Sequence, residues 1–236
     1  MIIGSICVLQ LLKGLSLKGL KRYAEAVQLY NEALSLNPKN PNILFIKAWC
    51  LHDMEKHEEA LKSIDEALFL DPKNPEYWRR KAACLHSLEK YEEALKALDE
   101  ALSLDPKNPE YWQIKAAILW HMRSFQKSLE SAEKALSLDA NHKLSLEYKA
   151  LLLITLDRAV EADLFFDQYL KAGGKKDGVC YSRACAYALL NRYDEALSNL
   201  KEAISLNEEK REEAKTDPDF KPLQGIEDFQ KLINNE

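Results

Sequence analysis

Apolar side chains recur every three to four residues through most of the chain, which is the spacing of an amphipathic helix. Residues 75–88 and residues 91–104 show the pattern most clearly. The positions on one face are Trp78, Lys81, Ala82 and Leu85 in the first segment, and Ala94, Leu98, Ala101 and Leu102 in the second. The pattern predicts two helices joined by a short turn and packed along their apolar faces.

Proline and asparagine mark where these helices begin and end. Pro72 stops the preceding helix, because its ring is incompatible with a helix interior. Asn74 is a good N-cap, and Pro75 then occupies the first helical position, where a missing N–H costs nothing. Residues 40–41 and 108–109 repeat this Asn-Pro arrangement. The helices are therefore expected to come in pairs separated by Asn-Pro junctions.

The helix pairs repeat at a fixed interval. The segment LDPKNPEYW begins at residue 70 and again at residue 104, an interval of 34 residues. Small residues keep this interval in two columns: Gly14, Ala48, Ala82, Ala116, Ala150 and Ala184, and Ala26, Ala60, Ala94, Ser128, Ala162 and Ala196. A period of this size indicates stacked supersecondary units. Residues 1–208 are therefore predicted to form six repeats, near 7–40, 41–74, 75–108, 109–142, 143–176 and 177–208.

The pattern changes after Leu206, and residues 209–236 are predicted to be a capping segment. Residues 207–214 should extend the last helix, residues 216–222 should form a turn-rich link, and residues 227–233 should form a short closing helix. Stacked repeats expose an apolar end unless it is capped. We therefore expect Phe229 and Leu232 to cover the end of the last repeat.

The spacing of particular residue types resembles that of the tetratricopeptide repeat. The residues that carry the resemblance are Trp78, Ala82, Leu85, Tyr91, Ala94, Leu98, Ala101 and Pro106. The resemblance implies an all-α fold, a right-handed α-solenoid of about six helix-turn-helix repeats with a C-terminal capping helix. One column departs from the family, where Leu is usual: Lys13, Lys47, Lys81, Lys115, Lys149 and Arg183. We expect their stems to pack while their charges reach water or a nearby carboxylate.

The resemblance also implies a function. In this family the first helix of each repeat lines a concave groove that holds a protein or peptide. Carried onto this chain, the groove residues are Phe45, Trp49, His52, Arg79, His86, Gln113, Trp120, His121 and Tyr181. Because Trp, Tyr and Arg dominate binding hot spots, we expect a partner with bulky apolar side chains near an Asp, a Glu or a C-terminus.

One specialised use of the groove is disfavoured. Some family members grip the C-terminal carboxylate of chaperones with Lys and Asn residues in three repeats. The matching positions here are Leu11, Leu15 and Ile46, which have no suitable polar group, and only Arg80 keeps a basic side chain.

Composition and motifs narrow the function further. The chain has 33 basic and 38 acidic residues and a net charge of −5, which argues against non-specific nucleic-acid binding. It contains no HExxH, CxxC or GxSxG motif and no Gly-rich phosphate loop. His52 and His86 share a column, with His121 one residue beyond it, but no acid or Cys completes a metal site. We therefore expect no catalytic residue, no cofactor, no metal and no enzyme activity.

The cysteines and the N-terminus indicate where the protein works. Five cysteines without paired spacing favour a reducing, cytoplasmic location. Residues 1–12 are apolar, but they lack the basic start and cleavage site of a signal peptide and are too short to cross a membrane. We interpret them as a packed helix.

These observations together favour an adaptor or scaffold that binds a protein or peptide. Two alternatives remain. The chain could be a regulatory or accessory subunit of an enzyme complex, or a structural unit that self-assembles through its apolar N-terminal helix.

Overall fold

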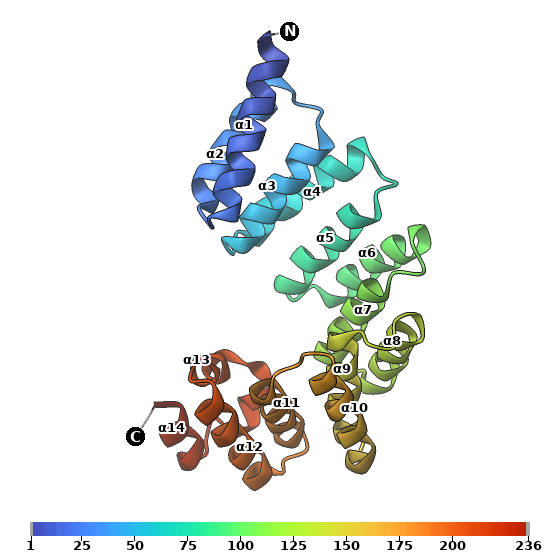
Figure 1. Cartoon of the computed structure of the whole chain (residues 1–236), viewed down its shortest axis with the longest axis vertical. Coiled ribbons are helices and arrows are strands. Elements are labelled where there is room, and N and C mark those ends of the chain that lie inside the picture. The colour runs from blue at the N-terminus through green and yellow to red at the C-terminus, as the bar shows by residue number, and fades with distance from the viewer. Residues whose placement is uncertain (1, 235–236) are drawn as a thin grey trace. The chain divides into compact units, whose positions relative to one another are not determined.

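The computed structural model describes residues 2–234 and, within them, the side chains of residues 9–158 and 161–234. This part of the chain contains fourteen α-helices, one 3-10 helix and no strand (Figure 1). The predicted packing of the first eight side chains, Cys7 included, lies outside the described side chains. The helices are α1 (Ile2–Gly19), α2 (Tyr23–Leu36), α3 (Pro41–Asp53), α4 (His57–Leu70), α5 (Pro75–Ser87), α6 (Tyr91–Leu104), α7 (Pro109–His121), α8 (Phe125–Leu138), α9 (Lys143–Thr155), α10 (Ala159–Lys171), α11 (Lys176–Leu189), α12 (Tyr193–Leu206), α13 (Glu209–Thr216), η1 (Pro218–Leu223) and α14 (Glu227–Asn234).

The helices begin where the Asn-Pro junctions predict. The side chain of Asn40 accepts hydrogen bonds from the backbone N–H groups of Asn42 and Ile43, at 3.1 and 3.2 Å. Asn74 and Asn108 each accept one from the residue two positions later, both at 3.0 Å. Each bond satisfies an N–H that has no partner within its own helix. The predicted N-caps are confirmed.

A left-handed residue closes the turn inside every helix pair. These six residues have φ between 55° and 61°: Lys21, Glu55, Glu89, Arg123, Asp157 and Asn191. In the turn from α3 to α4, the Lys56 N–H donates to the Leu51 carbonyl and the Glu55 N–H to the His52 carbonyl, both at 2.9 Å. This pair of bonds is a Schellman motif, and it recurs in the other five turns. One local geometry therefore ends the first helix of every repeat.

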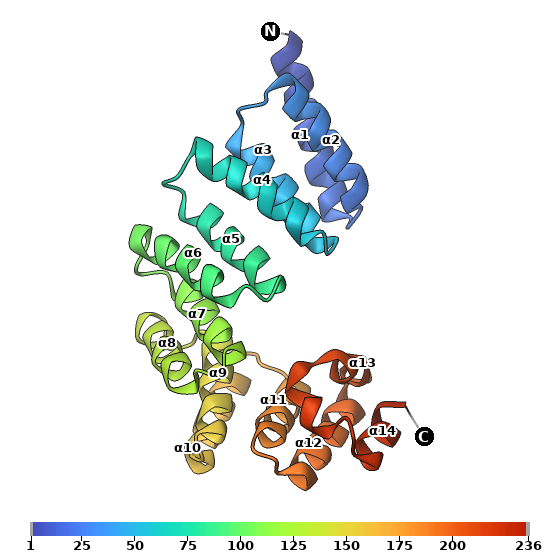
Figure 2. The ribbon, with the colours of Figure 1, turned by 180° about the vertical axis from the view of Figure 1, so that it is seen from behind.

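The chain divides into two compact units, and the boundary falls within α7. We call Met1–Tyr111 unit 1 and Trp112–Glu236 unit 2. Consecutive helices of unit 1 pack from α1 to α6, and α3 also contacts α5. The first helices of its pairs, α1 and α3, lie in front in Figure 1, and their partners α2 and α4 lie in front in the reverse view of Figure 2. Unit 1 is therefore built in two layers.

The column of small residues allows the two helices of a repeat to approach closely. Ala48 and Ala82 have no exposed surface. Gly14 occupies the same column in α1, where an added Cβ would lie 2.5 Å from Cε1 of Tyr30. Tyr30 is itself fully buried in α2. The ring of Tyr30 thus takes the space that a side chain at position 14 would need.

Three cations of the lysine column reach a nearby carboxylate, as expected. Lys81 Nζ lies 2.7 Å from Asp65, and Lys149 Nζ lies 2.9 Å from Glu133. Arg183 pairs with Asp163 in the same way. Each acid belongs to the second helix of the preceding repeat. These three cations therefore link neighbouring repeats.

The closing segment, which we define as residues 209–234, packs against α11 and α12 within unit 2. η1 contacts α11, and α14 contacts α12 and α13. Phe220, Leu223 and Phe229 have no exposed surface. The expected helical extension over residues 207–214 is wrong, because Asn207 is extended and its side chain caps a new helix by accepting from the Glu209 N–H at 3.1 Å.

The closing helix α14 buries its apolar face, but Ile233, and not the predicted Leu232, is the residue buried beside Phe229. Phe229 is fully buried as expected, and Ile233 is 5% exposed. Leu232 is only half-buried. Ile233 follows Phe229 by four positions, so both side chains fall on the same helical face.

Candidate functional site

The first helices of unit 1 gather aromatic and cationic side chains. Trp49 of α3 lies at their centre, with Lys18 Nζ of α1 at 3.2 Å and Arg80 Cζ of α5 at 4.6 Å from its ring centroid. Phe45 contacts Trp49 edge to face, with ring centroids 6.3 Å apart. We call Lys18, Phe45, Trp49 and Arg80 the Trp49 site. It combines an apolar surface with two positive charges.

Arg80 is a buried residue whose side chain forms no ion pair within the described part of the chain. Its residue surface is only 6% exposed, and it makes no hydrogen bond or ion pair with any described residue. Its Nε is buried and has no acceptor. Burial, reinforced by the charge of Arg79, lowers the pKa of Arg80. Contact with the face of Trp49 compensates part of the lost hydration, but an acceptor of matching charge is missing.

Arg79, which the sequence placed in the groove, already has partners. Its guanidinium lies 2.8 Å from Glu76 and 3.6 Å from Glu110. Glu76 also accepts a 2.6 Å hydrogen bond from the hydroxyl of Tyr111. Burial alone would raise the pKa of Glu76, but the bonds from Tyr111 and Arg79 outweigh it and lower that pKa. Arg79 is therefore part of an internal network, whereas Arg80 beside it is not.

Two of the three histidines of the predicted groove, His52 and His86, belong to the first helices of unit 1. His52 Nε2 is 3.2 Å from the hydroxyl of Ser87. Its pKa is lowered by burial, and further by the charges of Arg80 and His57. The His86 ring lies 5.6 Å from the ring of Tyr91. At neutral pH His52 is therefore uncharged and adds a polar edge rather than a third cation.

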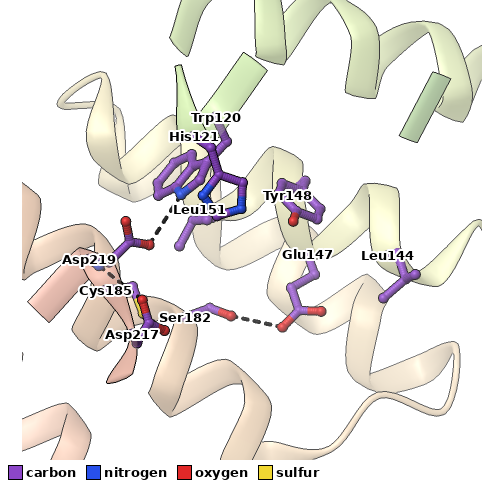
Figure 3. A pocket seen from close by; sticks show the side chains of 10 residues that line it. All are labelled: Trp120, His121, Leu144, Glu147, Tyr148, Leu151, Ser182, Cys185, Asp217 and Asp219. Atoms are coloured by element: carbon purple, nitrogen blue, oxygen red, sulfur yellow. Dashed lines mark hydrogen bonds between the residues drawn. The ribbon is translucent and has the colours of Figure 1, made fainter. Parts of the chain in front are cut away.

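Unit 2 contains a pocket between its first helices and the closing segment (Figure 3). The cavity has a volume of about 300 Å³. We call it the acidic pocket. It is lined by Trp120 and His121 of α7, Leu144, Glu147, Tyr148 and Leu151 of α9, Ser182 and Cys185 of α11, and Asp217 and Asp219 at the start of η1.

The closing segment covers several residues that were expected on the groove. Asp219 accepts a 3.1 Å hydrogen bond from Trp120 Nε1, and Asp217 accepts one of 3.0 Å from the hydroxyl of Tyr181. Trp120 is consequently only 3% exposed. Gln113, another residue expected on the groove, is also buried, at 7%. The exposed wall expected at Trp120 is absent from this structure because a segment about a hundred residues later binds its indole.

Burial perturbs the acids of the pocket. The pKa of Asp219 rises to about 6 through burial and then through the charge of Asp217. Burial also raises the pKa of Glu147, although a 2.8 Å hydrogen bond from Ser182 opposes the shift. No Lys or Arg is among the ten lining residues. The pocket therefore concentrates negative charge without a cation of its own.

Three possible metal ligands meet at one end of the pocket. Ligand atoms of Cys185, Asp217 and Asp219 all lie within 4.8 Å of one another, the one such group among the described residues. Burial and the two neighbouring carboxylates raise the pKa of Cys185 well above its ordinary value. The thiol is therefore protonated at neutral pH, and a metal that needs a thiolate would have to displace its proton.

Family models match most of the repeat region. A model described as anaphase-promoting complex, cyclosome, subunit 3 matches residues 19–101. Two models described as tetratricopeptide repeat match residues 109–142 and 178–210. No curated protein matches the chain.

Solved structures with the same helical architecture cover three quarters or more of the chain. PilF of Pseudomonas aeruginosa is 18% identical with a TM-score of 0.71, covering 100% of both chains. PilW, a type IV pilus biogenesis factor, is 15% identical with a TM-score of 0.72, covering 92% of this chain and 98% of its own. YrrB, described as having an unusual peptide-binding site, is 20% identical with a TM-score of 0.55, covering 76% and 92%.

Proposed function

Because this chain is a tetratricopeptide repeat protein, we propose that it is a scaffold or adaptor whose Trp49 site holds an acidic group of a protein or peptide partner. The observation that carries the proposal is Arg80. The residue is 6% exposed, and a buried guanidinium Nε that has no acceptor among the described residues is unfavourable by itself. A carboxylate supplied by a partner would form the charge-assisted bonds that the folded chain does not supply.

The surroundings of Arg80 define the partner further. Trp49 and Phe45 offer an aromatic surface, and Lys18 provides a second cation against the same ring. A segment with a bulky apolar side chain next to an Asp, a Glu or a free C-terminus fits both features. Binding energy at such contacts concentrates in a few aromatic and Arg residues.

This function requires no catalysis by the chain. We propose that the protein is not an enzyme and that it presents a preformed surface, which loses little conformational entropy on binding. The peptide-binding site described for YrrB, a protein of similar fold, supports such a role. We also propose a reducing, cytoplasmic location, because Cys50, Cys84, Cys180 and Cys185 are all unbridged and buried.

The test begins by capturing a partner from native lysate and mapping the peptide that binds. Its affinity is then measured for the parent chain, Trp49→Ala and Arg80→Met. Each change should weaken binding by about thirtyfold, the effect of a hot-spot residue. The Arg80 contribution should decrease as salt increases.

Thermal stability separates a binding role of Arg80 from a structural one. Arg80→Met replaces a buried, unpaired charge by an apolar side chain of similar length, so the melting temperature should stay level or rise. Lys62→Met is the matched control, because Lys62 is an exposed cation on α4. Unchanged affinity for Arg80→Met would refute the proposal, and a large drop in melting temperature would show that Arg80 serves the fold.

A further inference from the structure

We infer that the acidic pocket of unit 2 is a second binding site, and that it takes the cationic side chain of an Arg or Lys from a partner polypeptide. This inference stands apart from the proposed function of the Trp49 site, because the two sites use different residues on different units. It rests on the shape, the charge and the hydrogen bonding of the pocket.

The pocket has the size and the walls of a side-chain site. Its volume of about 300 Å³ is at the lower end of small-ligand cavities. Leu144 and Leu151 provide apolar contact for a methylene stem. Trp120 and Tyr148 add aromatic rings, which attract cations through their faces.

Carboxylates approach the pocket from two sides. Glu147 extends from α9, while Asp217 and Asp219 come from the closing segment on the other side of the cavity (Figure 3). Ser182 lies between them and donates to Glu147. The hydroxyl of Tyr148 points into the same space and makes no hydrogen bond with any described residue. A guanidinium or ammonium group has several donors in different directions, which suits acceptors placed in this way.

None of these three carboxylates forms an ion pair with a described residue. Elsewhere in unit 2 acids are neutralised, for example Glu133 by Lys149 and Glu202 by Lys176. Lys210 and Lys143 act on Glu147, and Arg123 acts on Asp219, without forming an ion pair with them, and Lys210 pairs with Glu213. Acids in a pocket that lack a direct ion pair favour a ligand that supplies one.

The alternative ligand is a metal ion at Cys185, Asp217 and Asp219. Those three atoms occupy one end of the pocket and leave Glu147 and the aromatic walls unused. A cationic side chain uses both ends of the cavity. The structure therefore favours the side chain, and the experiment below tests both.

The test is an NMR titration of the full chain with N-acetyl-arginine amide and with N-acetyl-citrulline amide, which has nearly the same shape without the charge. The indole N–H of Trp120, assigned with Trp120→Phe, reports binding because it bonds Asp219 at the pocket wall. The arginine compound should bind at least about tenfold more tightly than the citrulline compound, as expected for charge-assisted bonds.

Isosteric variants identify the carboxylates. Glu147→Gln and Asp219→Asn should each lower the affinity for the arginine compound by about fivefold or more, because each removes a charge but keeps the shape of the side chain. Glu130→Gln is the matched control, because Glu130 is an exposed acid on α8 and does not line the pocket. Arg80→Met should leave the titration unchanged, which keeps this result independent of the Trp49 site.

Two outcomes would overturn the inference. The first is equal affinity for the arginine and citrulline compounds at millimolar concentration. The second is that zinc chloride binds at one equivalent, shifts the same resonance and excludes the arginine compound, since the pocket would then be a metal site.

Discussion

Asp219 bonds the indole of Trp120 while most of its carboxyl group is shielded from water. The hydrogen bond favours the charged form, but burial and the neighbouring Asp217 outweigh it and bring the pKa to about 6, against an ordinary value of 3.8. The folded chain therefore holds this proton more tightly than the unfolded chain does. Stability and protonation are linked through that difference.

We predict a pH dependence of stability from Asp219. Its contribution to the free energy of unfolding is fully present below pH 3.8 and is lost as the pH rises through about 6. Between pH 4.5 and 7 the loss should be about 2 kcal/mol. Urea unfolding at both pH values measures it in the parent chain and in Asp219→Asn.

The comparison between the two chains isolates this one group. Asp219→Asn should show a smaller loss of stability over the same range, because amide and carboxylic acid are both neutral. Glu130→Gln should behave like the parent, since Glu130 is exposed. Parallel curves for the parent and Asp219→Asn would show that the carboxyl group titrates normally.

A second residue-scale prediction concerns Gly14. Gly14→Ala places a Cβ 2.5 Å from the Tyr30 ring and should destabilise unit 1 by about 1–3 kcal/mol, as overpacking does. Gly19→Ala, in the same helix, meets no atom within 4 Å and should be neutral or slightly stabilising. Thermal melts followed by circular dichroism compare the two variants. Equal melting temperatures would refute the close packing at position 14.

The candidate sites show where sequence reasoning reached its limit. A 34-residue alignment places side chains on a helical face, so Phe45 and Trp49 could be chosen together. It does not show that Glu76 pairs with Arg79 and leaves Arg80 without an acceptor. It also does not show that Asp219 covers Trp120, because that contact joins residues far apart in the sequence. The only signal for Arg80 was its match to a basic position in related grooves.

At the scale of elements, prediction was more complete. Asn-Pro junctions mark helix starts through local hydrogen bonds, and the structure confirms them at Asn40, Asn74 and Asn108. The helix ends were less visible, because the left-handed turn positions carry Lys, Glu, Arg, Asp and Asn rather than the usual Gly. The residue types at these positions therefore did not predict the turns, although the 34-residue period implied that a turn lies within each repeat.

The left-handed turns lead to an element-scale prediction. Glu89 has a φ of 58°, a conformation that strains any side chain with a Cβ. Glu89→Gly should leave the stability unchanged or raise it by up to about 1 kcal/mol. Glu93→Gly, two residues into α6, should lower it by about 1 kcal/mol, because Gly is unfavourable inside a helix. Denaturant unfolding of both variants provides the comparison, and equal losses would show that position 89 is not strained.

At the scale of the whole molecule, the closing segment contributes both to the stability of unit 2 and to the acidic pocket. Its aromatic residues Phe220 and Phe229 are fully buried, with ring centroids 5.8 Å apart. The same segment supplies Asp217 and Asp219 to the acidic pocket. A change that loosens the segment should therefore affect both the melting of unit 2 and the pocket.

We predict that Phe229→Ala lowers the free energy of unfolding by about 3–5 kcal/mol, the usual result of removing a buried aromatic ring. The Trp120 indole resonance should shift in the same variant, because the ring supports the segment that bonds it. Lys231→Ala, on the exposed side of α14, is the control and should change neither. Intact melting after removal of residues 227–236 would contradict the capping role.

The repeated junction LDPKNPEYW has a consequence for how such a chain changes length. Removing residues 75–108 would join Asn74 to Pro109, and the sequence across the new seam would read the same as before. Both helices lost, α5 and α6, end in backbone bonds that the flanking repeats also make. Ile114, which lies 34 residues after Arg80, would then take the position of Arg80 in the repeat. A single in-frame excision would thus leave the junction sequence unchanged while deleting the cation beside Trp49, so the cation can be removed without altering either junction.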